Sequence, residues 1–156
     1  PGFEGRTSDP AHLEGHRLVD GEVVYPGSTG EDIFTAIVHP YPQVFMVLGG
    51  HYHNGVDGED GEYHQVSENV AGSEVYEILA NYQSYPDGGQ GWLRIIEFQP
   101  GAGEDAPDRI AMSTYSPVLD DYRRGPRSEF SFDLSFDERF GLVPEEPATV
   151  SGAAGR

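Results

Sequence analysis

The pattern of hydrophobic and polar positions predicts one short helix followed by about five closely spaced strands. Ser28 and Glu31 match a capping box, in which two side chains satisfy free N–H groups at the start of a helix. The apolar positions that follow fall on one helical face; they are Ile33, Phe34, Ile37 and Val38. We therefore expect a helix over about residues 30–39, which Pro40 and Pro42 end.

The strands are predicted from short apolar or alternating runs that turn residues bound. Residues 44–48 are consecutive apolar residues between a Tyr-Pro turn signal and two glycines, which predicts a buried central strand. Further strands are expected at residues 63–67, 75–80, 92–98 and 110–115. Over residues 130–136, Phe and Leu alternate with Ser and Asp, which is typical of a strand with one buried and one wet face.

Composition divides the chain into three parts. Residues 1–27 are polar and rich in Gly and Pro, and we expect them to form a loop or extension. Residues 144–156 are small and polar, and they are expected to be a flexible tail. The helix and the strands lie in residues 28–143, and one helix before a run of mostly antiparallel strands indicates an α+β fold.

Two histidines follow the predicted strand at residues 44–48. His51 and His53 come directly after Gly49 and Gly50. Residues at i and i+2 of an extended segment project to the same side, so the two imidazoles could act together. Neutral imidazole is a common ligand of Zn, Mn and Fe. The pair is therefore a candidate half of a metal site, and the alternative is two polar residues in a loop at a strand exit.

This Gly-His-x-His sequence after an apolar strand resembles the last metal-binding motif of the calcineurin-like metallophosphoesterases. Residues 77–83, 88–98 and 114–117 are similar to the C-terminal part of bacterial members, and the resemblance covers about residues 28–140. It implies a dinuclear metal centre that hydrolyses phosphate mono- or diesters, with His51 and His53 ligating different ions (Mn, Zn or Fe). It also implies an αββα sandwich, of which this chain would hold the C-terminal part.

The earlier motifs of that family, of the types Asp-x-His, Gly-Asp and Gly-Asn-His, do not occur in the chain. His12 and His16 lie upstream, but neither follows an apolar strand as a further ligand should. We therefore expect the chain to be part of a longer enzyme, with the rest of that enzyme as its partner and with no activity alone. A non-catalytic β-rich binding module and a salt-adapted structural domain are the alternatives.

Charge and composition exclude some classes of binding partner. The net charge is −18, and all nine basic residues are Arg. Such a surface repels phosphate backbones, so nucleic acid is not expected to bind. The acid-rich, Lys-free composition suggests a salt-adapted or a high-GC bacterial or archaeal source. The absence of Cys excludes disulfides and thiolate ligands. No apolar run approaches the ~20 residues of a membrane helix, and both extracellular and cytoplasmic locations stay open.

Other polar residues have weaker functional signals. Residues 81–83 (Asn-Tyr-Gln) follow a predicted strand, where they could line a cleft or cap a turn. His64 is expected at the surface, and His39 at the C-terminus of the helix. For the following residues we favour a loop, solvated or surface-paired role: Tyr52 and Asn54, the acidic Asp57, Glu59, Asp60 and Glu62, and Arg123, Arg124 and Arg127 beside Asp120 and Asp121. Ser116, Ser128 and Ser131 lack the context of a nucleophile.

Overall fold

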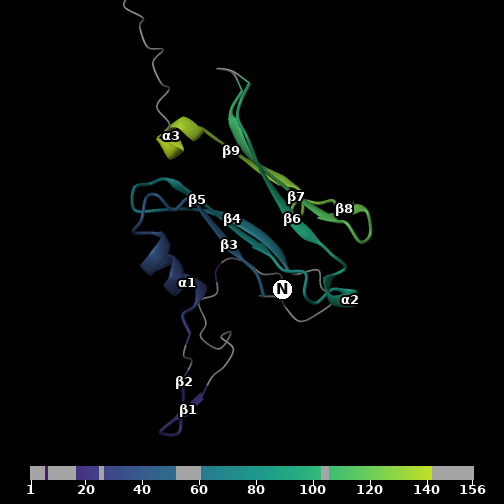
Figure 1. Cartoon of the computed structure of the whole chain (residues 1–156). Coiled ribbons are helices and arrows are strands. Elements are labelled where there is room, and N and C mark those ends of the chain that lie inside the picture. Colours follow the sequence, from purple (N-terminus) through teal and green to yellow (C-terminus); the bar gives the residue numbers. More distant parts are fainter. Residues whose placement is uncertain (1–5, 7–16, 25–26, 52–60, 103–105, 142–156) are drawn as a thin grey trace, which may run out of the picture.

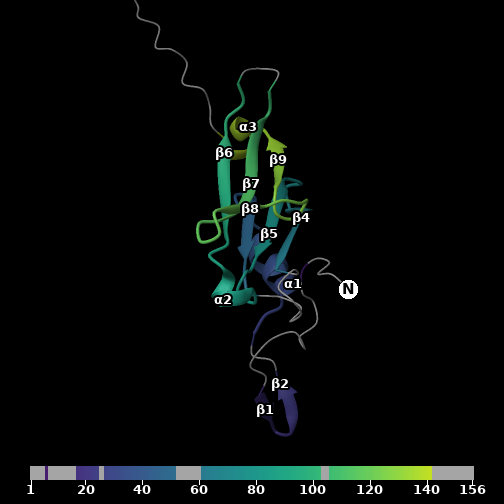
Figure 2. The same cartoon turned by 90° about the vertical axis from the view of Figure 1, so that its right-hand side faces the viewer.

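The computed structural model describes residues 6, 17–24, 27–51, 61–102 and 106–141. Their elements form three layers, in which a short helix covers one face of a first sheet and a second sheet packs on the other face (Figures 1 and 2). The fold is mixed α+β with mostly antiparallel strands, so the predicted fold class is confirmed at this level.

The predicted helix forms as α1 (Gly30–Ile33), which continues as a π-helical turn, η2 (Phe34–Val38). Its capping box lies one residue later than predicted: Thr29 accepts from the backbone N–H of Asp32, and the Asp32 side chain accepts from the backbone N–H of Thr29. A shorter Asp suffices because the hydroxyl and carboxylate face each other across the first turn. Phe34 and Val38 are the buried side of this helix.

The first sheet has the order β3-β5-β4, with β3 spanning Met46–Gly49, β4 Glu62–Glu68 and β5 Glu74–Ala80. Strand β5 runs parallel to β3 and antiparallel to β4. Among the described strands of this sheet, β5 lies at the centre and β3 at an edge. The prediction of a buried central strand at residues 44–48 is therefore wrong. Val47 packs toward the helix and Met46 toward the second sheet, whereas Leu48 is 62% exposed.

The second sheet is antiparallel throughout, with β7 at its centre. Its strands are β6 (Leu93–Gln99), β7 (Asp108–Ser116), β8 (Asp121–Arg123) and β9 (Phe130–Leu134). Two short elements flank it. The segment α2 (Pro86–Gly89) is a turn in which Asp87 and Gly88 have positive φ, and α3 (Phe136–Phe140) is a helical turn that the sequence pattern did not predict. The alternation that predicted a strand through residue 136 stops earlier, because Ser135 caps α3 by accepting from the backbone N–H of Glu138.

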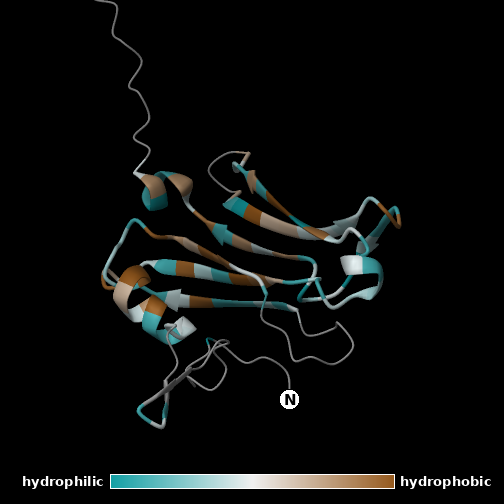
Figure 3. Ribbon diagram, turned by 60° about the horizontal axis from the view of Figure 1, so that its bottom comes forward, coloured by the Kyte–Doolittle hydropathy of each residue, from teal (hydrophilic) through white to brown (hydrophobic). Residues whose placement is uncertain are grey.

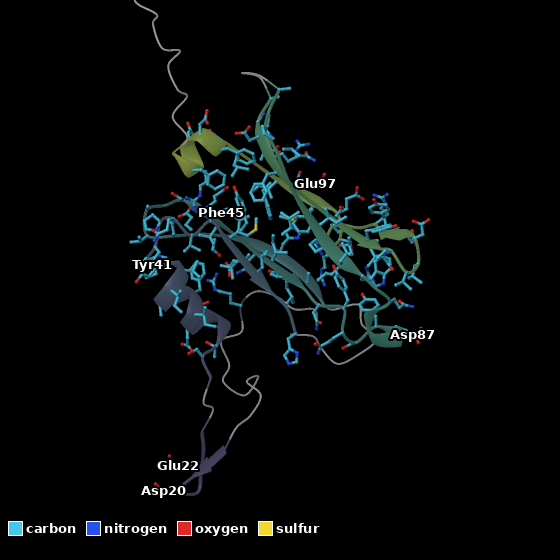
Figure 4. All side chains as sticks on the ribbon, viewed as in Figure 1. Asp20, Glu22, Tyr41, Phe45, Asp87 and Glu97 are labelled. Atoms are coloured by element: carbon cyan, nitrogen blue, oxygen red, sulfur yellow. The ribbon has the colours of Figure 1, made fainter. Side chains whose placement is uncertain are left out.

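The main core lies between the two sheets. Figure 3 shows hydrophobic residues along the facing strands. The buried members come from β5, β7 and α3: Tyr76, Ile78, Ile110, Met112 and Phe136. The rings of Tyr76 and Phe132 stack with centroids 4.3 Å apart and join the sheets directly. Phe45 closes one end of this core against α3, where its ring meets Phe140 edge-on (Figure 4).

The expected loop at residues 1–27 contains a two-stranded hairpin, formed by β1 (Arg17–Val19) and β2 (Glu22–Val24). Its turn residues, Asp20 and Gly21, both have positive φ (53° and 85°), as the tight Asp-Gly hairpin turn requires. The Asp-Gly pair is the sequence signal for this turn. The hairpin projects away from the layers (Figure 1). No helix in the described ranges is both long and apolar enough to cross a membrane.

We expect Ile110→Ala to lower the free energy of unfolding by about 2–5 kcal/mol, because the Ile110 side chain is completely buried between the two sheets. The loss combines the removed apolar contacts with the cavity that remains. Val118→Ala is the control, because Val118 is 72% exposed and its truncation should change the free energy by no more than about 0.5 kcal/mol. Urea unfolding measures both, and equal effects at the two positions would contradict the described packing.

Candidate functional site

The candidate site lies where β3 and β5 end. These strands are parallel, with Gly49 opposite Leu79, so the residues that follow each strand emerge at the same end of the sheet. His51 follows β3, and Gln83 follows β5. His51 Nδ1 lies 3.0 Å from Gln83 Oε1, a hydrogen bond between residues 32 positions apart in the sequence. The structure thus places His51 at the strand exit, as predicted.

The backbone of His51 has a positive φ of 68°. Residues with a side chain adopt a positive φ rarely, and histidine does so more often than most. The described residues with a side chain that share it are Asp20, Asp87, Gln90 and Asp120. The conformation turns the chain out of β3 immediately after Gly49 and Gly50. It leaves His51 exposed at the sheet end.

The turn after β5 is held by Asn81. Its side-chain Oδ1 accepts from the backbone N–H of Gln83 at 3.1 Å, and its own backbone N–H donates to Gly61 at 2.7 Å. A Cβ at position 61 would collide with the Asn81 carbonyl oxygen, so glycine allows this close approach. Of the two alternatives for residues 81–83, turn capping is confirmed for Asn81, and Gln83 contacts the candidate ligand His51.

The second predicted ligand, His53, lies outside the described residues, as do Tyr52, Asn54 and the acidic Asp57, Glu59 and Asp60. Within the described ranges, no three His, Asp or Glu side chains come together in a way that could hold a metal ion. His51 is therefore the one proposed metal ligand that lies within the described residues.

An apolar pocket of about 410 Å³ lies beside the site, between the helix and the outer face of the first sheet. Phe34, Val47 and Leu79 are among its lining residues. Its polar end is formed by Arg6, which donates to Glu77 of β5 at 2.5 Å and to Glu31 of α1 at 2.8 Å. The sequence carried no signal for this ion pair, because its partners lie on three separate segments.

Glu62 forms the most extensive buried polar cluster in the described structure. Its carboxylate is 2% exposed and lies between the two sheets. It accepts hydrogen bonds from Ser128 (2.6 Å), Tyr82 and Arg94 (2.8 Å each) and Thr114 (3.0 Å), and Arg123 lies 3.3 Å away. Burial by itself raises the pKa of Glu62, but these donors and the two guanidinium charges outweigh it and hold the pKa below 4.5.

This cluster corrects several sequence-based expectations. Glu62 is not part of a solvated acidic loop, since it begins β4 and points into the sandwich. Arg123 pairs with Glu62, and Arg124 pairs with Glu129 at 2.8 Å, where Asp120 and Asp121 were expected as partners. Ser128 has a structural role as a donor to Glu62, and Ser116 donates to the backbone carbonyl of Gln90.

His64 is partly buried, where a surface position was expected. It lies on β4 opposite Ile78, and its ring stacks on Phe130 with centroids 3.8 Å apart. Burial, followed by the charges of Arg94 and Arg127, lowers the pKa of His64 below 6.5. Glu62 and His64 are two positions apart in β4, so their side chains project to the same face of the sheet. Both side chains are polar, which is why the sequence pattern predicted that they would be exposed.

Comparisons with known proteins give one relative to report. The chain is 39% identical over 120 residues to the uncharacterized protein YvnB of Bacillus subtilis (strain 168). The match covers 73% of the chain but only 9% of YvnB, so the chain spans less than a tenth of that protein's length. No family model matches the chain, and no solved structure matches it.

The pKa of His64 makes folding stability depend on pH. Between its lowered folded pKa and 6.5, the unfolded chain binds more protons than the folded chain, so stability falls as the pH falls through this window. We expect His64→Phe, which retains the stacking on Phe130, to lose less stability than the wild type between about pH 7.5 and about pH 5.5. Urea unfolding at the two pH values measures this. His39→Phe, at an exposed position, is the control, and parallel pH profiles of wild type and His64→Phe would contradict the assignment.

Proposed function

We propose that the chain is the C-terminal portion of a dinuclear-metal phosphoesterase domain that hydrolyses phosphate mono- or diesters within a longer polypeptide. The observation that carries the proposal is the placement of His51, at the exit of a strand, in a strained backbone conformation and with Nδ1 bonded to Gln83. Metal-binding histidines usually engage their other ring nitrogen in this way. The Gly-His-x-His sequence supplies the second imidazole, His53.

Two bound metal ions would neutralise phosphate charge and lower the pKa of the attacking water. In this proposal His51 and His53 each hold one ion, and the bridging carboxylate and the other ligands come from outside the chain. The positive charge of the metal ions would matter for this protein in particular. Its net charge of −18 repels an anionic phosphate ester, so the attraction has to be local.

The layers support the same proposal. A helix, a sheet and a second sheet fit three consecutive layers of an αββα sandwich. Strand β3, which leads into the site, lies at an edge with Leu48 62% exposed, and the apolar pocket opens beside it. An exposed apolar edge next to an apolar pocket is costly in isolation. Further strands and helices of a longer domain would cover both, and the length of YvnB is consistent with such a longer polypeptide.

A non-catalytic β-rich binding module is the second candidate. The pocket of about 410 Å³ favours it, because apolar pockets of this size are typical of small-ligand sites. In that case His51 and Gln83 would be polar groups at the rim of a binding site. The two candidates differ in one measurable property, which is whether the intact protein carries tightly bound metal.

We expect the chain by itself to be inactive as a phosphatase with added Mn²⁺ or Zn²⁺. Two histidines are too few for a dinuclear centre, since even a mononuclear catalytic zinc site usually has three protein ligands. Hydrolysis of p-nitrophenyl phosphate and of its diester by the purified chain is the measurement. Steady turnover that a chelator abolishes would contradict this division of the ligands.

In the longer protein, His51→Ala and His53→Ala should each lower metal content and phosphodiester turnover, with turnover falling by more than about 100-fold. Each substitution removes a direct ligand and leaves the apolar strand intact. His39→Ala is the matched control, because His39 is exposed at the end of the helix. Elemental analysis beside turnover measures the effect. Normal metal content and rate in both motif variants would reject the phosphoesterase and favour the binding module.

A further inference from the structure

We propose that Gln83 is a positioning residue for His51: its side-chain carbonyl selects the tautomer of the imidazole and fixes the direction of the ring. The role of this contact in holding a metal rests on the proposed function, whereas the tautomer itself does not.

The chemistry of the contact fixes the proton. An amide oxygen only accepts, so across the 3.0 Å contact between Gln83 Oε1 and His51 Nδ1 the imidazole donates. A neutral imidazole carries one N–H, so Nδ1–H places the ring's acceptor lone pair on Nε2. Neutral imidazole binds a metal ion through this lone pair. Gln83 thereby specifies Nε2 as the ligating atom of His51.

The direction of the ring is fixed because Gln83 is itself held. Its backbone N–H donates to the Oδ1 of Asn81, and Asn81 is only 7% exposed. The turn continues with a hydrogen bond from the Tyr85 N–H to the Tyr82 carbonyl at 3.0 Å. The parallel register of β3 and β5 then sets the distance between this turn and His51. The contact therefore joins the ends of two paired strands.

A purely structural role explains the contact poorly. Both His51 and Gln83 are exposed, and an exposed hydrogen bond between side chains adds little to folding because water replaces it readily. The orientation and the tautomer of the imidazole are therefore the properties that this contact changes most.

The first test reads the tautomer directly in the chain, without any metal. Long-range ¹H–¹⁵N correlation spectra of the imidazoles at about pH 8, above the ordinary histidine pKa, show which nitrogen carries the proton. We expect the wild type to carry it on Nδ1 of His51, Gln83→Leu to shift it toward Nε2, and Gln83→Glu to keep it on Nδ1. His51→Ala identifies the signal, and Ser84→Ala, at the exposed neighbour of Gln83, is the control.

The second test measures metal retention in the longer protein against a competing chelator. Gln83→Leu should weaken Mn²⁺ or Zn²⁺ binding by about 10–100-fold, the usual effect of losing an outer-shell partner, and Gln83→Glu should retain binding. An unchanged tautomer in Gln83→Leu would overturn the positioning role whatever the metal content. A changed tautomer with unchanged metal affinity would overturn its part in the metal site. A wild-type protein without metal would instead reject the proposed function and leave the tautomer assignment standing.

Discussion

Burial of strand β5 on both of its faces is the constraint that orders the three layers. Val75 packs against the helix, and Tyr76 and Ile78 pack against the second sheet, so alternate residues of one strand belong to two separate cores. A strand with this pattern must be covered on both sides, and β3 and β4 pair along its two edges. Strand β3 therefore ends beside β5, and its exit, with His51, lies at the end of the sheet.

Between the sheets, the Glu62 cluster adds a polar element to an otherwise apolar core. A carboxylate that is 2% exposed needs several donors, and the cluster supplies them from β5's exit, β6, β7, β8 and the turn before β9. Removal of any one of these hydrogen-bond donors would leave the negative charge of Glu62 less well compensated. The cluster consequently fixes the register between the sheets more strictly than apolar contacts do, because apolar contacts tolerate sliding. It includes Tyr82, which lies between Asn81 and Gln83 in the turn of the candidate site.

The location of the candidate site follows from these two features. The turn after β5 is anchored by Asn81 and by Tyr82 in the Glu62 cluster, so a hydrogen-bonded turn presents Gln83 to His51. The site lies at an open edge of the sheet beside an apolar pocket. A hydrogen-bonded turn at an open edge suits a site that more of the polypeptide completes. The same edge and pocket would suit a binding module, and bound metal is the property that separates the two.

The sequence by itself determined the α+β class, the short helix and most strand positions, because periodicity and turn residues are local properties. It also placed His51 at a strand exit. Only the tertiary structure decided that β3 is an edge, since the choice of strand partners depends on residues far apart in the chain. Glu62 and His64 appeared exposed because polar character predicts exposure, and their burial depends on donors and rings supplied by distant strands. The contact between His51 and Gln83 has the same origin, because parallel pairing of β3 and β5 brings together two turns that are 32 residues apart.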